Sequence, residues 1–241
     1  MGDMTAAAEV RAADRPPGRG GSLGDAVRLA VQVFGELLIT FGVVVLLFAV
    51  YELKVTDLRT AATQRGLQSE LERAWGGAPP GPQNGPDPVV EPRKGEPLAV
   101  VGIPRLGEDY SRVVVEGVSH EDLKKGPGHY PDTALPGQVG NLVLSGHRTT
   151  YGAPFADVDQ LRPGDVVDVR VRYRTYHYRI TGTVIVSPDA KDVLLPVPNR
   201  PGVAANERLL TMTTCHPRFS AAQRMIVFGE MAPGDFTDAS A

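Results

Sequence analysis

The sequence predicts a mainly β domain that follows one membrane-spanning helix, and three observations lead to this prediction. Several short runs between residues 98 and 231 alternate apolar and polar residues with period two, as strands with one buried face do. Turn sequences such as Arg-Pro-Gly-Asp at 162–165 separate these runs, and helical patterns between them are short. Residues 29–52 are almost entirely apolar and long enough to cross a bilayer as a helix. Many strands at this spacing indicate a closed β-barrel or a sandwich.

The predicted strands are Ala99–Ile103, Tyr110–Val115, Gly140–Ser145, Asp165–Arg172, His177–Ser187, Arg208–Thr214 and Met225–Glu230. Short helices are expected at Glu121–Lys125, Phe155–Leu161 and Ala190–Leu194. We place the folded domain at residues 98–231 and a C-terminal tail at 232–241.

The N-terminal part predicts a membrane anchor. Residues 1–28 are polar and rich in Ala, Arg, Gly and Pro, which predicts a disordered segment. Within 29–52, Glu36 costs about 3 kcal/mol at a bilayer centre, and the many Leu, Ile, Val and Phe side chains at about −0.3 to −0.6 kcal/mol each outweigh it. A cleaved signal peptide is the alternative, but no Ala-x-Ala-like site follows the run, so we favour an uncleaved single-pass anchor. A slight excess of Arg before the run predicts a cytoplasmic N-terminus.

Residues 53–97 connect the anchor to the domain. Apolar residues recur with moderate helical spacing between Val55 and Trp75, which fits a juxtamembrane stalk or, equally well, a solvated helix of no special function. The Pro- and Gly-rich stretch from Gly76 to Pro97 predicts a semi-extended linker.

Composition narrows the function classes. A net charge of −3 over 241 residues argues against a nucleic-acid-binding protein, which would carry a basic excess. The single cysteine rules out an internal disulfide. No His-Glu-x-x-His or paired-cysteine pattern is present, so we expect no metal site and no cofactor.

That one cysteine, Cys215, ends the β-rich run 207–215. A thiolate is the strongest nucleophile among the side chains, and a strand end can hold it at the rim of a sheet. The commoner role of an isolated cysteine, a small buried apolar residue, is the alternative.

Two further residues supply what a reactive thiol needs. His147 follows the apolar run 141–145 and a glycine, so an acid–base group stands at a second strand end. Arg224 begins the apolar run after Cys215, and a hairpin between them would bring its guanidinium beside the thiol. A loop histidine that caps a turn and an exposed arginine at a strand start are the alternatives. The three together favour a catalytic site, because their chemistry is complementary.

These residues resemble the sortase family. Its Thr-Leu-x-Thr-Cys motif corresponds to Thr-Met-Thr-Thr-Cys at 211–215, with Met212 as a volume-conserving departure from Leu. The strings 145–155 and 214–220 look like class E, the housekeeping sortases of high-GC Gram-positive bacteria. The resemblance covers about residues 98–231.

The resemblance implies an eight-stranded β-barrel and a membrane-anchored cysteine transpeptidase on the extracellular face. Cys215 would be the nucleophile, His147 the general acid and base, and Arg224 the group that stabilises the oxyanion or orients the peptide. Tyr130, Thr149 and Thr214 are candidate substrate-binding residues. The implied partners are secreted proteins with a Leu-Ala-x-Thr-Gly or Leu-Pro-x-Thr-Gly-like sorting signal, and the amine of a peptidoglycan precursor of the lipid II type.

Two other functions stay open. A cell-surface cysteine peptidase that only hydrolyses its substrate would use the same residues. A non-catalytic anchored β-domain that binds a partner would not need the thiol.

Overall fold

The computed structural model describes residues 23–76, 93–172 and 174–238, without the side chains of 52–57. They divide into two compact units, residues 1–50 and 51–241, which are described separately. Most of the predicted disordered N-terminus and most of the predicted linker lie outside the described residues.

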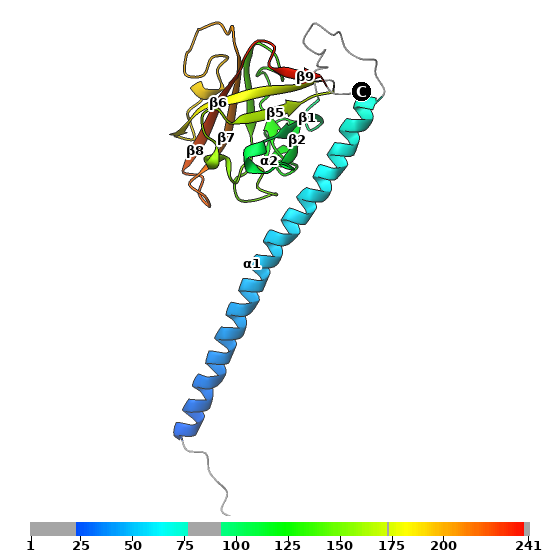
Figure 1. The fold of residues 1–241 in the computed structure, drawn as a ribbon. Coiled ribbons are helices and arrows are strands. Elements are labelled where there is room, and N and C mark those ends of the chain that lie inside the picture. The colour runs from blue at the N-terminus through cyan, green and yellow to red at the C-terminus, as the bar shows by residue number, and fades with distance from the viewer. Residues whose placement is uncertain (1–22, 77–92, 173, 239–241) are drawn as a thin grey trace, which may run out of the picture. The chain divides into compact units, whose positions relative to one another are not determined.

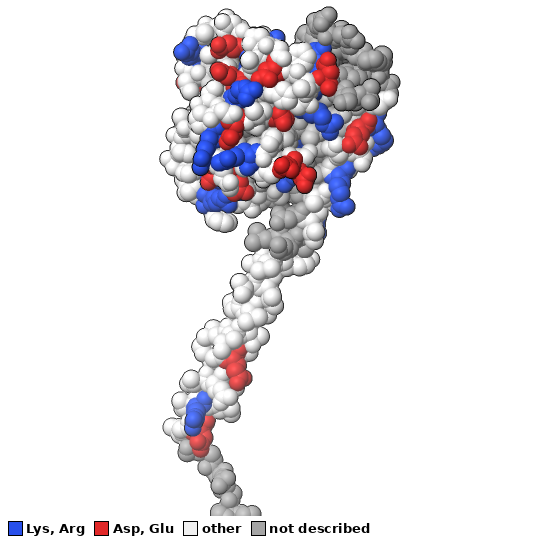
Figure 2. Space-filling view, in the orientation of Figure 1, with Lys and Arg blue, Asp and Glu red and all other residues white. Residues whose placement is uncertain are grey.

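The first unit contains the start of helix α1 (Leu23–Gly76), whose residues 23–51 are long and apolar enough to cross a membrane. Its apolar side chains are exposed on all sides, as Leu38 at 54% and Phe41 at 67% illustrate. A helix that is apolar all round needs an apolar environment. The Glu36 carboxylate accepts a hydrogen bond from Gln32 Nε2 at 3.3 Å, so polar groups in this stretch pair within the helix. Figure 2 shows this stretch as mostly uncharged, while charges of both signs cover the visible face of the other unit. The finding agrees with a single-pass anchor.

The second unit is built on nine described strands. They are β1 (Pro97–Gly102), β2 (Ser111–Glu116), β3 (Gly128–His129), β4 (Gly140–Ser145), β5 (Val166–Arg170), β6 (Arg174–Val186), β7 (Arg208–His216), β8 (Gln223–Met231) and β9 (Phe236–Asp238). The remaining elements are the helix α2 (His120–Leu123) and the 3₁₀ turns η1 (Pro104–Leu106), η2 (Val158–Gln160) and η3 (Asp192–Leu194).

The strand order is β5-β1-β2-β3-β4-β7-β8-β6-β9, and pairing of β5 with β6 closes β1 to β8 into a barrel (Figure 1). The barrel prediction is therefore confirmed. Strand β9 continues the ladder on β6 beyond the barrel. The sequence did not predict β3 and β9, because strands of two and three residues carry no readable alternation.

The helix expected at Phe155–Leu161 is reduced to η2. Phe155, Val158 and Leu161 are all buried in the barrel core. Only Val158 belongs to η2, while Phe155 lies in the turn before it and Leu161 directly follows it.

The barrel core fixes which side chains face outward. On β7, Leu210 and Met212 point into the core. Because successive strand residues alternate between faces, Thr211, Thr213 and Cys215 lie on the outer face. The site is built on that face.

The C-terminal part of α1, residues 58–76, belongs to the second unit; we call it the docking segment. Leu67, Leu71 and Trp75 pack against valines of β1 and β2: Val100, Val113 and Val115. The sequence left open a stalk or a solvated helix, but the structure shows the apolar stripe of this segment buried on the barrel.

Gln64 of the docking segment is hydrogen-bonded to barrel backbone. Its Nε2 donates to the carbonyl oxygens of Val113 at 3.0 Å and Lys125 at 2.8 Å. Its Oε1 accepts from the amide of Val113 at 2.7 Å. The segment is thereby fixed in register as well as by apolar contact.

Candidate active site

The β7–β8 hairpin sets the position of two predicted catalytic residues. Cys215 and Arg224 are direct partners in the antiparallel register. Residues opposite each other in such a ladder project from the same face, with Cβ atoms about 4.5–5.5 Å apart. The β7–β8 pairing confirms the hairpin that was predicted from the sequence. Cys215 is partly buried there.

Strand β4 brings His147 to the same rim. β4 runs parallel to β7, with Ser145 opposite Thr213. The Gly146 amide donates to Thr213 O at 3.1 Å, and Thr214 Oγ1 donates to Gly146 O at 2.7 Å. His147 therefore follows β4 at the level of Cys215, the last residue but one of β7.

Gly146 is required at this junction. A Cβ there would lie 2.6 Å from Cδ2 of the buried Phe155 ring. Glycine lets the chain pass over this ring before His147.

The imidazole of His147 lies in a half-buried, partly aromatic environment. Its centroid is 5.0 Å from that of the Tyr151 ring, at an interplanar angle of 43°. Its Nε2 is buried and has no hydrogen-bond partner among the described residues. Burial, helped by the positive charge of His120, lowers the pKa of His147 below the ordinary value for histidine. The neutral imidazole is therefore favoured near pH 7.

The guanidinium of Arg224 is held at the hairpin turn. Its Nη1 donates to the carbonyl oxygens of Ala221 at 2.9 Å and Gln223 at 3.0 Å. These bonds fix its orientation beside the Cys215 strand end. A fixed cation at this position can stabilise developing negative charge or orient a peptide carbonyl.

Arg148 is a residue that sequence reasoning missed. It is only 4% exposed. Its Nη1 donates to Cys215 O at 3.4 Å and lies 3.0 Å from His216 Nδ1, while its Nη2 is 2.8 Å from Asp159 Oδ2. Arg148 thus ties the ends of β4 and β7 together. Its place directly after His147 was the available signal.

The candidate substrate residues occupy different positions. Tyr130 follows β3, and its amide donates to Val143 O at 2.9 Å. Since Val143 is opposite Thr211, the register sets Tyr130 on the same face as Cys215. Thr149 lies partly buried in the loop after His147. Thr214 is buried, points to the opposite face from Cys215 and bonds Gly146, so its observed contact is structural.

The connection between β6 and β7 is held near this face by a buried amide. Asn141 Nδ2 donates to Val193 O and Leu195 O, both at 3.0 Å. Its Oδ1 accepts from Thr211 Oγ1 at 2.8 Å. The connection and the outer face of β7 are therefore fixed relative to each other.

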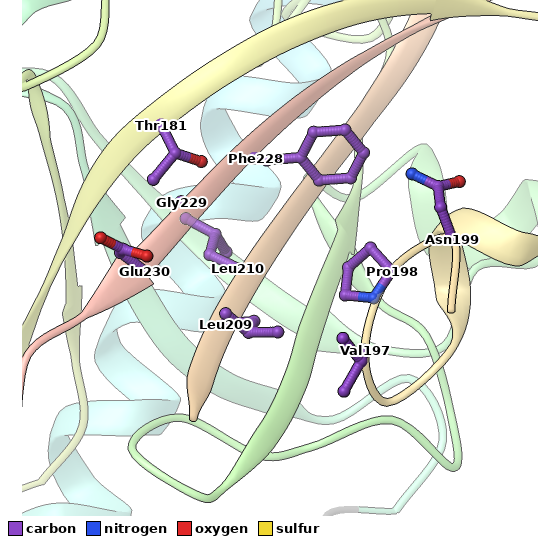
Figure 3. A pocket seen from close by; sticks show the side chains of 9 residues that line it. All are labelled: Thr181, Val197, Pro198, Asn199, Leu209, Leu210, Phe228, Gly229 and Glu230. Carbon is purple, nitrogen blue, oxygen red and sulfur yellow. The ribbon is translucent and has the colours of Figure 1, made fainter. Parts of the chain in front are cut away.

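A pocket of about 240 Å³ lies along β7 and β8, at the end of these strands that is far from Cys215 and Arg224 (Figure 3). It is lined by Thr181, Val197, Pro198, Asn199, Leu209, Leu210, Phe228, Gly229 and Glu230. Leu209 is six residues from Cys215, which corresponds to about 20 Å along a strand. The pocket is thus separate from the thiol, although Leu209 and Phe228 share its face. The described residues contain no cluster of three or more His, Cys, Asp or Glu suited to a metal ion.

Comparisons with known proteins agree on one family. A family model described as "Sortase domain" matches residues 101–232. Sortase SrtE1 of Streptomyces coelicolor is 36% identical over 211 residues, which are 84% of this chain and 57% of that protein. The chain thus spans little more than half the length of that relative.

Solved structures give the same result. The SrtF sortase from Corynebacterium diphtheriae superposes with a TM-score of 0.60 at 30% identity, covering 66% of this chain and 95% of the other. Sortase E1 from Streptomyces coelicolor, solved with a tripeptide in the active site, gives a TM-score of 0.54 at 34% identity, covering 60% and 91%.

Proposed function

Because this chain belongs to the sortase family of cysteine transpeptidases, we propose that it cleaves a sorting signal between Thr and Gly and transfers the new C-terminus to a cell-wall amine. The observation that supports this most directly is the strand register. It sets Cys215 opposite Arg224 and brings His147 off the neighbouring parallel strand at the same rim. Nucleophile, cation and acid–base group then serve one reacting carbonyl.

The first half of the reaction forms a thioester. The Cys215 thiolate attacks the carbonyl carbon of the signal's Thr, and negative charge develops on the carbonyl oxygen. Arg224 stabilises that charge or orients the peptide. The Thr–Gly peptide bond breaks as the His147 imidazolium gives its proton to the departing Gly nitrogen.

The second half transfers the acyl group. The amine of a peptidoglycan precursor of the lipid II type attacks the thioester carbon, and neutral His147 takes the amine proton. The carbon–sulfur bond breaks, which restores the thiolate and the imidazolium. Water must be kept from the thioester long enough for the amine to react.

The peptide is proposed to lie along the outer face of β7 and β8. Tyr130, Cys215 and Phe228 share that face by register. Thr149 flanks it from the His147 loop, and Thr214 acts from beneath by supporting Gly146. The signal is of the Leu-Ala-x-Thr-Gly or Leu-Pro-x-Thr-Gly type, and the class E likeness favours the form with Ala.

The proposal includes a cellular location for the catalytic domain. Residues 29–52 anchor the protein in the membrane once, with the N-terminus in the cytoplasm and the catalytic domain on the extracellular face. The slight Arg excess before the anchor supports this orientation. Secreted proteins that carry sorting signals are then the donors.

The full-length protein in detergent tests the proposal. It is incubated with fluorogenic Leu-Ala-x-Thr-Gly and Leu-Pro-x-Thr-Gly peptides, with and without an added amine. We expect cleavage of at least one peptide and an amine-dependent shift from hydrolysed to transferred product. Cleavage with no transferred product would identify a hydrolytic peptidase. No cleavage of either peptide by the folded protein would indicate a non-catalytic binding domain.

A further inference from the structure

The Tyr151 ring is the aromatic surface against which His147 packs. The two centroids are 5.0 Å apart. His147 follows a strand, but its own loop rather than a ladder partner sets the orientation of its ring. Its Nε2 is buried and has no hydrogen-bond partner among the described residues, so the contact with the Tyr151 ring is a restraint on the imidazole that a hydrogen bond at Nε2 does not replace.

Tyr151 itself sits in an unusual backbone. Tyr151, Gly152 and Ala153 have φ values of 53°, 70° and 39°. Non-glycine residues rarely adopt this left-handed region and persist there only where surrounding contacts hold them. The loop is closed by bonds from the Phe155 amide to His147 O at 3.0 Å and from Tyr110 Oη to Pro154 O.

The docking segment contacts this loop directly. Thr60 is buried, and a Cβ added to Gly152 would lie 3.1 Å from Thr60 Cγ2. One helical turn further on, Gln64 makes its three hydrogen bonds to the barrel backbone. The helix therefore supports the loop at the glycine next to Tyr151, and its own position is fixed by Gln64.

Helix α2 and the residue that follows it also lie next to the Tyr151 ring. His120 meets the ring edge-on, with centroids 6.0 Å apart, and Lys124 Nζ lies 6.0 Å from its centroid. The ring of Tyr151 is thus restrained by contacts with His147, His120 and Lys124.

We propose that Tyr151 is a positioning residue for His147 and that the docking segment of α1, through Thr60 and Gln64, holds the loop that carries it. The inference rests on the proposed function, because it gives His147 its role in proton transfer. It makes the helix between membrane and barrel a part of the catalytic architecture rather than a tether.

Full-length variants in detergent test the positioning role. Tyr151→Ala is expected to lower kcat about 10- to 100-fold with little change in KM, as misplaced catalytic groups do. Tyr151→Phe keeps the ring and should retain activity within about threefold of wild type. Wild-type kcat in Tyr151→Ala, or equal losses in both variants, would overturn the ring contact as the cause.

A second readout does not need activity. Histidine-selective NMR titration, with His147→Gln to assign the signal, follows the imidazole of His147 directly. Removing the ring exposes the imidazole, so its pKa should rise in Tyr151→Ala and stay near the wild-type value in Tyr151→Phe. His120 from α2, Lys124 directly after α2, Cys215 from β7 and Arg224 from β8 remain in both variants, so the difference reports the ring. An unchanged His147 titration in Tyr151→Ala would overturn the inference.

A matched pair of variants on the docking segment tests whether this segment holds the loop that carries Tyr151. Gln64→Ala removes the hydrogen bonds to the barrel, whereas Gln68→Ala removes only a bond to Glu72 on the same helix. We expect a several-fold loss of kcat and a raised His147 pKa in Gln64→Ala alone. Equal kcat and equal His147 pKa in the two variants would overturn the proposal that Gln64 holds the segment against the barrel for this purpose. If wild type cleaves neither peptide, the proposed function fails, and the titrations still decide whether Tyr151 and the helix set the His147 environment.

Discussion

The two sides of the candidate site are held by different kinds of structure. Cys215 and Arg224 are placed by sheet register, since each is the direct partner of the other in the β7–β8 ladder. His147 lies one residue beyond the last backbone bond of its strand, and side-chain contacts with Tyr151 and its loop orient it. Register is fixed by many hydrogen bonds at once, whereas a loop depends on a few contacts. The acid–base side is therefore the side that remote residues can tune.

Among the residues held by the β7–β8 register, loss of Cys215 as the nucleophile should have the largest effect. Cys215→Ala should reduce cleavage of the sorting-signal peptide by about 10⁴-fold or more, because no other thiol is present. The denaturation midpoint should stay close to wild type, since the thiol makes little of the core. A continuous fluorescence assay measures cleavage, mass spectrometry detects the acyl-enzyme, and urea denaturation gives the midpoint. Residual cleavage near the wild-type rate would show that another group is the nucleophile.

On the loop side, His147→Gln should cost about 10²- to 10⁴-fold in kcat/KM, the usual range for a general acid–base. Wild-type kcat/KM should follow a bell in pH, because only thiolate with imidazolium is reactive. Burial lowers the His147 pKa, so the limb of the bell that reports His147 should lie below the ordinary titration range of histidine. A pH series of initial rates checks this. A rate that climbs steadily to high pH would contradict the acid role.

Arg224→Ala and Arg224→Lys sharpen the register side. Loss of the guanidinium should reduce kcat about 10- to 100-fold, because a group that stabilises the transition state is removed. Lysine keeps the charge but loses the planar guanidinium, whose Nη1 donates to both Ala221 O and Gln223 O, so rescue should be partial at best. Full activity in Arg224→Lys would mean that charge alone suffices.

The smallest effect concerns the junction between the two sides. Arg148→Met removes the buried cation that bonds Cys215 O and Asp159, and should lower the free energy of unfolding by about 2 kcal/mol. The matched control is Arg218→Met, whose ion pair with Asp157 is solvent-exposed and worth about 0–1 kcal/mol. Urea denaturation of the purified proteins gives both values. Equal losses would show that the buried contacts of Arg148 add no more stability than the exposed ion pair of Arg218.

The strands that the sequence predicted correctly were those long enough to show a pattern. Gly140–Ser145 matches β4 residue for residue, and the runs that became β6, β7 and β8 were located to within a few residues. Of the helices predicted at Phe155–Leu161 and Ala190–Leu194, only the 3₁₀ turns η2 (Val158–Gln160) and η3 (Asp192–Leu194) formed. The catalytic roles of Cys215, His147 and Arg224 remain predictions, and their positions at one rim of the barrel are consistent with those roles.

The sequence patterns did not predict contacts between segments that lie far apart in the chain. Gln64 reads as one more polar residue on a helix, yet it bonds the backbone at Val113 and Lys125. Tyr151 and Arg148 lie beside the predicted histidine, but only the fold shows what they touch. Side-chain partners at long sequence separation leave no local periodicity.

Local patterns along the chain predict an apolar span, most of the strands, and a thiol, an imidazole and a guanidinium at strand ends. These are local properties, set by side-chain polarity and spacing. Only the folded chain shows that β4 lies parallel to β7, that the helix after the apolar span packs on the barrel, and that Tyr151 contacts His147. Those relations depend on which distant surfaces bury each other, and that is settled only when the whole chain packs.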